Sequence, residues 1–193
     1  MLCKGPVIVH YRTCVKPRYT ASMKITFRST TQVDTPILPG IERSAGQRFL
    51  RVPSLAWLAD GHTVTLSQHQ HYVDNEMSWL ALADNSSVGF LLAEPLASSL
   101  FIAEVSLHLD WQGKGIGRGL IRYVAEQARE KGYASLTLTT FRDVPWNAPF
   151  YAGLGFEMLT DEALSTPLRQ KREAEAAHGL AYDSRCAMRL MLR

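Results

Sequence analysis

Hydrophobic residues recur along the chain with two different periods. Short apolar runs between polar turns, several of them alternating, predict six strands, at residues 24–31, 78–84, 88–96, 100–109, 134–141 and 185–192. Apolar residues at spacings of three and four predict helices, at residues 39–50, 53–61, 67–75, 120–132, 147–155 and 166–179. Because strands and helices are mixed along the chain, we expect one α/β sheet with helices on both faces.

The helix at 120–132 has the clearest pattern. Five apolar residues form one stripe along it, namely Leu120, Ile121, Val124, Ala125 and Ala128. Gly132 is expected to end this helix. Ser54, Asn147 and Thr166 stand where N-caps of three shorter helices are expected.

The strand predicted at 100–109 mixes apolar and ionisable side chains. Strict alternation places Ile102, Glu104, Ser106 and His108 on one face, and Ala103, Val105, Leu107 and Leu109 on the other. Two ionisable groups are therefore expected on the same face of this strand.

Composition describes an ordinary globular chain of 193 residues, 46% hydrophobic and 20% charged. Four basic residues and no acid fall in residues 1–22, which leaves 17 basic against 18 acidic residues in 23–193. A near-neutral body argues against a nucleic-acid-binding protein, and no apolar stretch is long enough to span a membrane. We expect one domain at 23–193, preceded by an N-terminal extension at 1–22.

Cysteine and histidine usage indicates neither a disulfide framework nor a metal site. Cys3, Cys14 and Cys186 are odd in number and have no metal-binding spacing. A reducing, cytoplasmic setting is expected. His69 and His71 alternate, but with no third ligand in register they are expected to face solvent.

Four glycines stand within seven positions of "WQGKGIGRGL", residues 111–120, between a predicted strand and a predicted helix. A bare backbone at the start of a helix offers N–H groups and a positive dipole end to an anion. A P-loop is excluded because Gly115 follows Gly113-Lys114, and a dinucleotide fingerprint is excluded because its third glycine is missing. The spacing that remains is Gln112-x-x-Gly115-x-Gly117.

This pattern resembles the acetyl-CoA signature of the GCN5-related N-acetyltransferase (GNAT) superfamily. A second segment, "FYAGLGF" at 150–156, resembles a later helix-to-strand segment of the same family. The resemblance covers most of 23–193 in element order and is strongest from Glu104 to Phe156. It implies a single mixed, mostly antiparallel sheet whose splayed central strand pair holds acetyl-CoA.

The resemblance also implies which residues hold this cosubstrate. The pyrophosphate is expected on the turn formed by Gln112, Gly113, Lys114, Gly115, Ile116 and Gly117. Lys114 and Arg118 could add charge there or be solvated, and main-chain groups of Val105, Leu107 and Leu109 are expected to line the cofactor. Where the family often has an asparagine this chain has Val144, so Asn147 could cap its helix, contact coenzyme A (CoA), or both.

Two side chains are the candidate catalytic residues. Tyr151 matches the family's usual general acid, and a phenol with a pKa near 10 remains protonated at neutral pH. The alternative for Tyr151 is packing alone. Glu104 is the first candidate for the base that deprotonates the amine, with a structural ion pair as the alternative, and His108 is the second. The Leu107 N–H is the candidate donor to the thioester carbonyl.

The acceptor is less well defined than the cosubstrate. We expect a small-molecule amine, with protein N-terminal or lysine acetylation and non-catalytic CoA sensing as alternatives. Aromatic side chains that could line its pocket are Trp57, Trp79, Phe141 and Trp146, and Asp143 could hold a cationic amine. No nucleic-acid or membrane partner is expected. The family often forms dimers, and the C-terminal strand is a candidate pairing edge for a homodimer.

Overall fold

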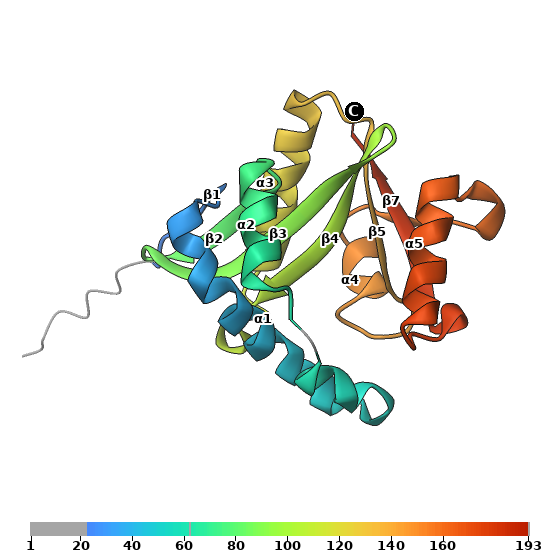
Figure 1. Ribbon diagram of the computed structural model, residues 1–193, viewed down its shortest axis with the longest axis horizontal. Helices are drawn as coiled ribbons and strands as arrows, with labels where there is room; N and C mark the ends of the chain where they lie inside the picture. The colour runs from blue at the N-terminus through green and yellow to red at the C-terminus, as the bar shows by residue number, and fades with distance from the viewer. Residues whose placement is uncertain (1–22, 62, 193) are drawn as a thin grey trace, which may run out of the picture.

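The computed structural model describes residues 23–61 and 63–192, so the predicted extension at 1–22 lies outside the described residues. Within them, seven strands form one sheet in the order β1-β2-β3-β4-β5-β7-β6 (Figure 1). The strands are β1 (Ile25–Ser29), β2 (Ser78–Ala83), β3 (Ser86–Leu96), β4 (Ser99–Leu107), β5 (Ser135–Phe141), β6 (Glu157–Met158) and β7 (Arg185–Met191). All neighbours are antiparallel except β4 and β5, which are parallel. The sheet is mixed and mostly antiparallel, as predicted.

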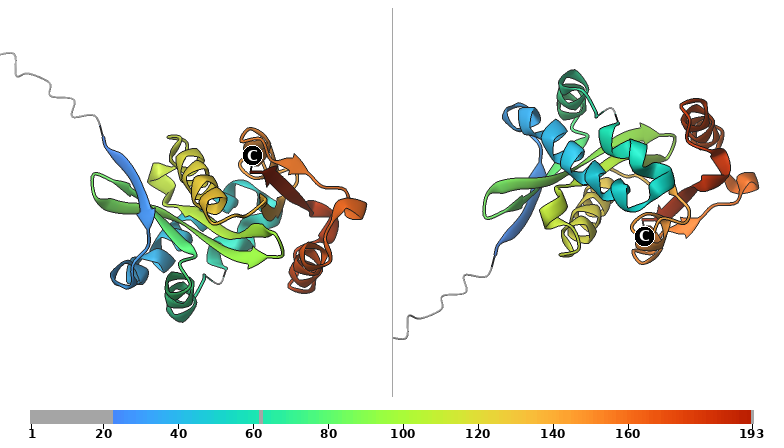
Figure 2. Two further views of the ribbon diagram at one scale, coloured as in Figure 1. Left: turned by 90° about the horizontal axis from the view of Figure 1, so that it is seen from above. Right: turned by 90° about the horizontal axis from the view of Figure 1, so that it is seen from below.

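Helices cover both faces of the sheet (Figure 2). The α-helices are α1 (Leu38–Gly46), α2 (Leu66–Asp74), α3 (Ile116–Glu130), α4 (Ala148–Ala152) and α5 (Thr166–Ala177). Short 3-10 helices lie between them: η1 (Gln32–Ile37), η2 (Gln47–Arg51), η3 (Pro53–Asp60), η4 (Leu109–Trp111), η5 (Asp161–Ala163) and η6 (Tyr182–Ser184). No helix in 23–61 or 63–192 is long and apolar enough to cross a membrane.

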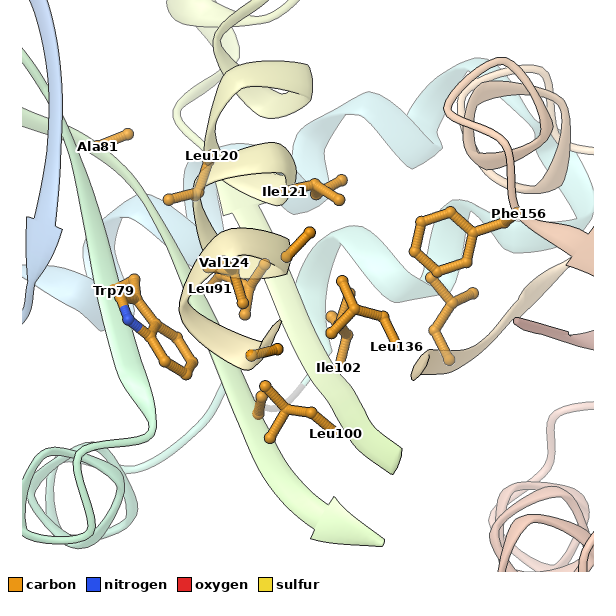
Figure 3. Packing of buried hydrophobic residues seen from close by; sticks show 14 of the residues in the cluster. Trp79, Ala81, Leu91, Leu100, Ile102, Leu120, Ile121, Val124, Leu136 and Phe156 are labelled. Carbon is orange, nitrogen blue, oxygen red and sulfur yellow. The ribbon is translucent and has the colours of Figure 1, made fainter. Parts of the chain in front are cut away.

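The main core lies between α3 and the sheet (Figure 3). The predicted stripe of α3 is buried there, and its residues pack on Trp79, Leu91 and Leu136 from three strands. A second cluster lies under α1 and α2 on the opposite face, and a third, around Phe101, lies under α5. Gly132 follows α3 with a φ of 82°, which confirms the predicted end of this helix.

Three predicted helix boundaries differ from the structure. The helix predicted at 39–50 is the α-helix α1 followed by the 3-10 helix η2, and the segment 53–61 is also a 3-10 helix. Val52, with an extended backbone, precedes η3, so Ser54 lies inside it and is not its cap. Ser165 rather than Thr166 is the N-cap residue of α5, so the helix begins one residue earlier than expected and Pro167 is its second residue, still in the first turn.

Strands β4 and β5 separate after a short common ladder. They pair only over Ser99–Phe101 and Ser135–Thr137, which are the first three residues of each strand. Figure 1 shows the two strands side by side where they begin and diverging toward their other ends. This confirms the predicted splayed pair and leaves the inner edges of both strands open.

A β-bulge in β4 changes the expected faces of this strand. Leu92 pairs with Glu104 and Ala93 pairs with Ile102, so Ala103 is an extra residue without a partner. The extra residue reverses the alternation. Ile102 therefore packs in the core on the α3 face, whereas Glu104, opposite Leu92, faces α1. The prediction that these two side chains share a face was wrong.

Candidate active site

A cleft of about 940 Å³ opens where β4 and β5 diverge. Its walls are the second half of β4, the end of β5, the glycine turn, α4 with the loop before it, and the arm formed by α1, η2 and η3. Glu104, Val105, Leu107, Asn147 and Tyr151 all line it. The structure thus brings the residues predicted for catalysis together with the residues predicted to bind the cofactor.

The four glycines of the turn have two different structural roles. Gly113 and Gly115 have φ values of 75° and 80°, and a Cβ on either would meet nothing within 4 Å. Both line the cleft, and the N–H groups of the first turn of α3 have no intrahelical acceptor. This part of the turn fits an anion.

Gly117 and Gly119 instead permit close packing. A Cβ on Gly117 would lie 3.1 Å from Leu107 Cδ1, and a Cβ on Gly119 would lie 2.6 Å from the Phe27 ring. Gly117 also lines the cleft, so its place beside the pyrophosphate stays a prediction, and its missing Cβ in addition makes room for Leu107.

The polar side chains of this turn are directed to protein partners. Gln112 donates from Nε2 to the Leu107 carbonyl (2.9 Å), and its Oε1 accepts from Arg48 Nη1 (2.9 Å). Lys114 Nζ lies over the Trp111 ring, outside the cleft, and Ile116 is buried in the core. Arg118 lines the cleft and donates to the Gly153 carbonyl (2.9 Å), which links α3 to the end of α4.

The open edge of β4 presents main-chain groups to the cleft. The His108 N–H donates to Val88 in β3, so by alternation the N–H groups of Val105 and Leu107 point the other way, into the cleft. Leu109 does not continue this edge. It belongs to η4, and its N–H donates to Ser44 Oγ (3.1 Å), so the expectation that Leu109 lines the cofactor needs correction.

Glu104 lies at the bottom of the cleft with its carboxylate largely removed from solvent. Its Oε1 accepts from Ser106 Oγ (2.8 Å). Burial raises the pKa of Glu104, and the Ser106 hydroxyl, the charge of Arg185 and the Val105 amide partly offset this. A carboxyl group with a raised pKa is a better proton acceptor in its ionised form than one in water.

A second carboxyl group, Glu42 of α1, faces the same cleft and was not found from the sequence. Its Oε2 accepts from the Val64 N–H (2.9 Å). Burial, with a further contribution from the charge of Glu104, raises the pKa of Glu42 to about 7. No motif or spacing in the sequence points to Glu42, because only the packing of α1 on β4 brings it near Glu104.

Tyr151, on α4, lines the same cleft as Glu104. Its ring packs against Phe150 and Phe156, with centroids 5.2 and 5.6 Å away. Burial and then the charge of Glu104 raise the pKa of Tyr151 well above its usual value, while Arg185 opposes this. The phenol therefore keeps its proton at neutral pH.

Asn147 precedes α4 but makes no side-chain capping hydrogen bond. Its Nδ2 donates to Thr140 Oγ1 (2.8 Å), and its Oδ1 is buried at the cleft without a partner in the described residues. Capping by this side chain is therefore excluded. The free oxygen is suited to accept from an amide N–H, such as the two that a pantetheine arm carries.

Several other candidates lie away from the cleft. The His108 side chain accepts from the Asp110 N–H (3.4 Å) at the start of η4 and does not line the cleft. Among the aromatic candidates, Phe141 and Trp146 line it, whereas Trp79 is in the core and Trp57 is exposed. His69 is fully buried against Phe90, so the expectation that it faces solvent was wrong.

Solved structures show the same fold in known acetyltransferases. PaiA N-acetyltransferase from Thermoplasma acidophilum, solved with coenzyme A, matches with a TM-score of 0.64 and 17% identity, over 88% of this chain and 99% of that one. The ribosomal-protein-S18-alanine N-acetyltransferase from Escherichia coli matches with a TM-score of 0.61 and 16% identity, over 88% and 94%. The fold is that of an N-acetyltransferase.

Residues 47–156 match the family model of the acetyltransferase (GNAT) family, so the chain belongs to this family. Mycothiol acetyltransferase from Nocardiopsis dassonvillei is 30% identical over 107 residues, which cover 52% of this chain and 32% of that protein. The chain spans about a third of the length of the curated relatives it matches. The matched segment contains the glycine turn, Glu104 and Tyr151, and the predicted family is confirmed.

The residues of the cleft fit acetyl-CoA, the cosubstrate of this family. Gly113 and Gly115 leave open space at a helix N-terminus, where a pyrophosphate can meet main-chain N–H groups. The open edge of β4 and the free Oδ1 of Asn147 offer hydrogen-bonding groups for the pantetheine amides.

Proposed function

We propose that the chain is an acetyl-CoA-dependent N-acetyltransferase that transfers the acetyl group directly to the primary amine of a small molecule. The observation that supports this proposal is that Glu104, Tyr151 and the glycine turn line one and the same cleft. A protein that only senses CoA has no need of an acid and a base together in this place.

Each residue has one role in the proposed reaction. Acetyl-CoA supplies an activated acetyl thioester. Glu104 accepts the proton that the amine nitrogen loses as its bond to the acetyl carbon forms, directly or through one water. The Leu107 N–H donates to the carbonyl oxygen as negative charge develops there. Tyr151 donates its proton to the sulfur as the carbon–sulfur bond breaks, so the products are the acetamide and the free thiol.

The walls of the acceptor side favour a small amine. Ser44 binds the Leu109 N–H, and Phe49 packs edge-on against Phe141 and Trp146, with centroids 5.8 and 5.9 Å away. The arm therefore contacts both the segment after β4 and the aromatic side chains around the start of α4, and we propose that this enclosure suits a small amine. One relative is named mycothiol acetyltransferase, and one protein of the same fold is named ribosomal-protein-S18-alanine N-acetyltransferase, so protein N-terminal acetylation is the alternative acceptor class.

The test is thiol release from acetyl-CoA with small primary amines and with short peptides that have a free N-terminus. Tyr151→Phe should lower kcat by about 10²- to 10⁴-fold while CoA affinity stays unchanged. Tyr123→Phe is the matched control, because this ring stacks on Phe27 away from the cleft. CoA binding without thiol release from any amine would instead indicate a sensor, and release with peptides alone would indicate a protein acetyltransferase.

A further inference from the structure

Arg48 of η2 lines the cleft and contacts two of its other walls. Its Nη1 donates to Gln112 Oε1 (2.9 Å) at the glycine turn. Its guanidinium lies over the Trp146 ring, with Cζ 4.4 Å from the centroid. A single cation thus connects the arm, the glycine turn and the loop before α4.

The charge of Arg48 is not neutralised within the described part of the chain. No carboxylate lies within ion-pairing distance there, and Nη1 is its only nitrogen with a hydrogen-bond acceptor. The Nε atom is buried without a partner. Burial and then the neighbouring charge of Arg51 lower the pKa of Arg48. A negative charge beside the guanidinium would offset both effects.

The geometry of the guanidinium shows which edge is free. Because Nη1 is held by Gln112, the edge formed by Nε and Nη2 carries the donors without partners. This edge matches two oxygens of a carboxylate or phosphate, and the cation–π contact with Trp146 uses none of these donors. A buried donor left unpaired is costly, so the site favours a ligand that pairs with it.

We propose that Arg48 binds an oxyanion of one of the two substrates through its Nε and Nη2 edge. This inference rests on the proposed function, since it assumes that both substrates enter this cleft. Two sources present the same chemistry. One is a phosphate of acetyl-CoA at the adjacent glycine turn. The other is a carboxylate of the acceptor, whose amine would lie toward Glu104.

The experiment compares the full chain with Arg48→Gln and Arg48→Lys by isothermal titration calorimetry. The ligands for the first arm are CoA, pantetheine and inorganic pyrophosphate. The ligands for the second arm are L-phenylalanine and phenethylamine, which differ by the carboxylate, titrated into CoA-saturated protein. Arg51→Gln is the matched control, because it removes the same charge from the same 3-10 helix at an exposed position.

If the oxyanion is a phosphate, Arg48→Gln weakens CoA and pyrophosphate about 10- to 100-fold and leaves pantetheine unchanged. If it is a carboxylate, CoA affinity is unchanged and L-phenylalanine weakens by a similar factor relative to phenethylamine. In either case Arg48→Lys recovers only part of the loss, because lysine keeps the positive charge but lacks the paired donors of the guanidinium edge.

The inference is overturned if Arg48→Gln, folded by circular dichroism, binds all five ligands as the wild type and Arg51→Gln do. Arg48 would then only connect the arm to the turn. Failure of the proposed function has a different signature, since a wild-type chain that binds no CoA refutes that function whatever the Arg48 variants do.

Discussion

The carboxyl group of Glu42 should make the stability of this protein depend on pH in a way that one substitution removes. Its pKa is 4.5 in an unfolded chain and about 7 in the folded one, because burial and the charge of Glu104 disfavour ionisation. Below pH 4.5 the group is protonated in both states and has no effect. Between pH 4.5 and 7 the unfolded chain releases the proton first, so the free energy of unfolding falls as pH rises.

The magnitude follows from the two pKa values. A pKa difference of this size corresponds to at most about 3 kcal/mol, since each pKa unit is worth about 1.4 kcal/mol. Glu42 is only partly buried, so solvent screening reduces the effect, and we expect about 2 kcal/mol. Glu42→Gln keeps an oxygen that can accept from the Val64 N–H and removes the titrating group.

Urea unfolding between pH 4.5 and 8 measures this effect. Glu42→Gln should match the wild type at pH 4.5 and exceed its free energy of unfolding by about 2 kcal/mol at pH 8. In a Glu104→Gln background the difference should shrink, because one cause of the raised pKa is gone. Glu173→Gln, at an exposed position, controls for the loss of a charge. Parallel curves for wild type and Glu42→Gln would refute the argument.

Two further predictions concern glycines. Gly115→Ala places a side chain at a φ of 80° and should cost about 1–2 kcal/mol of stability. Gly40→Ala, with open space in α1, should instead stabilise the protein by up to about 1 kcal/mol. Thermal unfolding measures both, and equal effects would contradict the argument that the positive φ of Gly115 makes the difference. Gly89→Ala puts a Cβ 2.2 Å from Leu107 Cδ2 and 2.8 Å from the Ser106 carbonyl, so it should cost about 1–3 kcal/mol, and an unchanged urea midpoint would contradict this.

The sequence predicted those features that depend on local pattern. The strands, the stripe of α3 and the glycine turn are each defined within a few consecutive residues. The boundaries of η3 and α5 were less accurate, because a cap is decided by one residue's backbone angles. The bulge at Ala103 was not predictable from alternation, because an unpaired residue shows itself only in the register against β3.

The site was predictable in part for the same reason. Gln112 and Tyr151 lie in motifs, so their spacing located them. Glu42 and Arg48 do not, since they reach the cleft only through the packing of the arm across β4. The pKa of Glu42 depends on the nearby charge of Glu104, and the orientation of Arg48 depends on its contacts with Gln112 and Trp146.

The arm therefore links the proposed acceptor side of the cleft to the main chain on which the thioester is proposed to lie. Ser44 binds the Leu109 N–H just after the strand edge, and Arg48 binds Gln112 at the start of the glycine turn. Gln112 in turn holds the carbonyl of Leu107, whose N–H faces the cleft. A displacement of the arm would be transmitted through these hydrogen bonds to the end of β4. Residues that border the acceptor side thus also fix the main chain on which the thioester is proposed to lie.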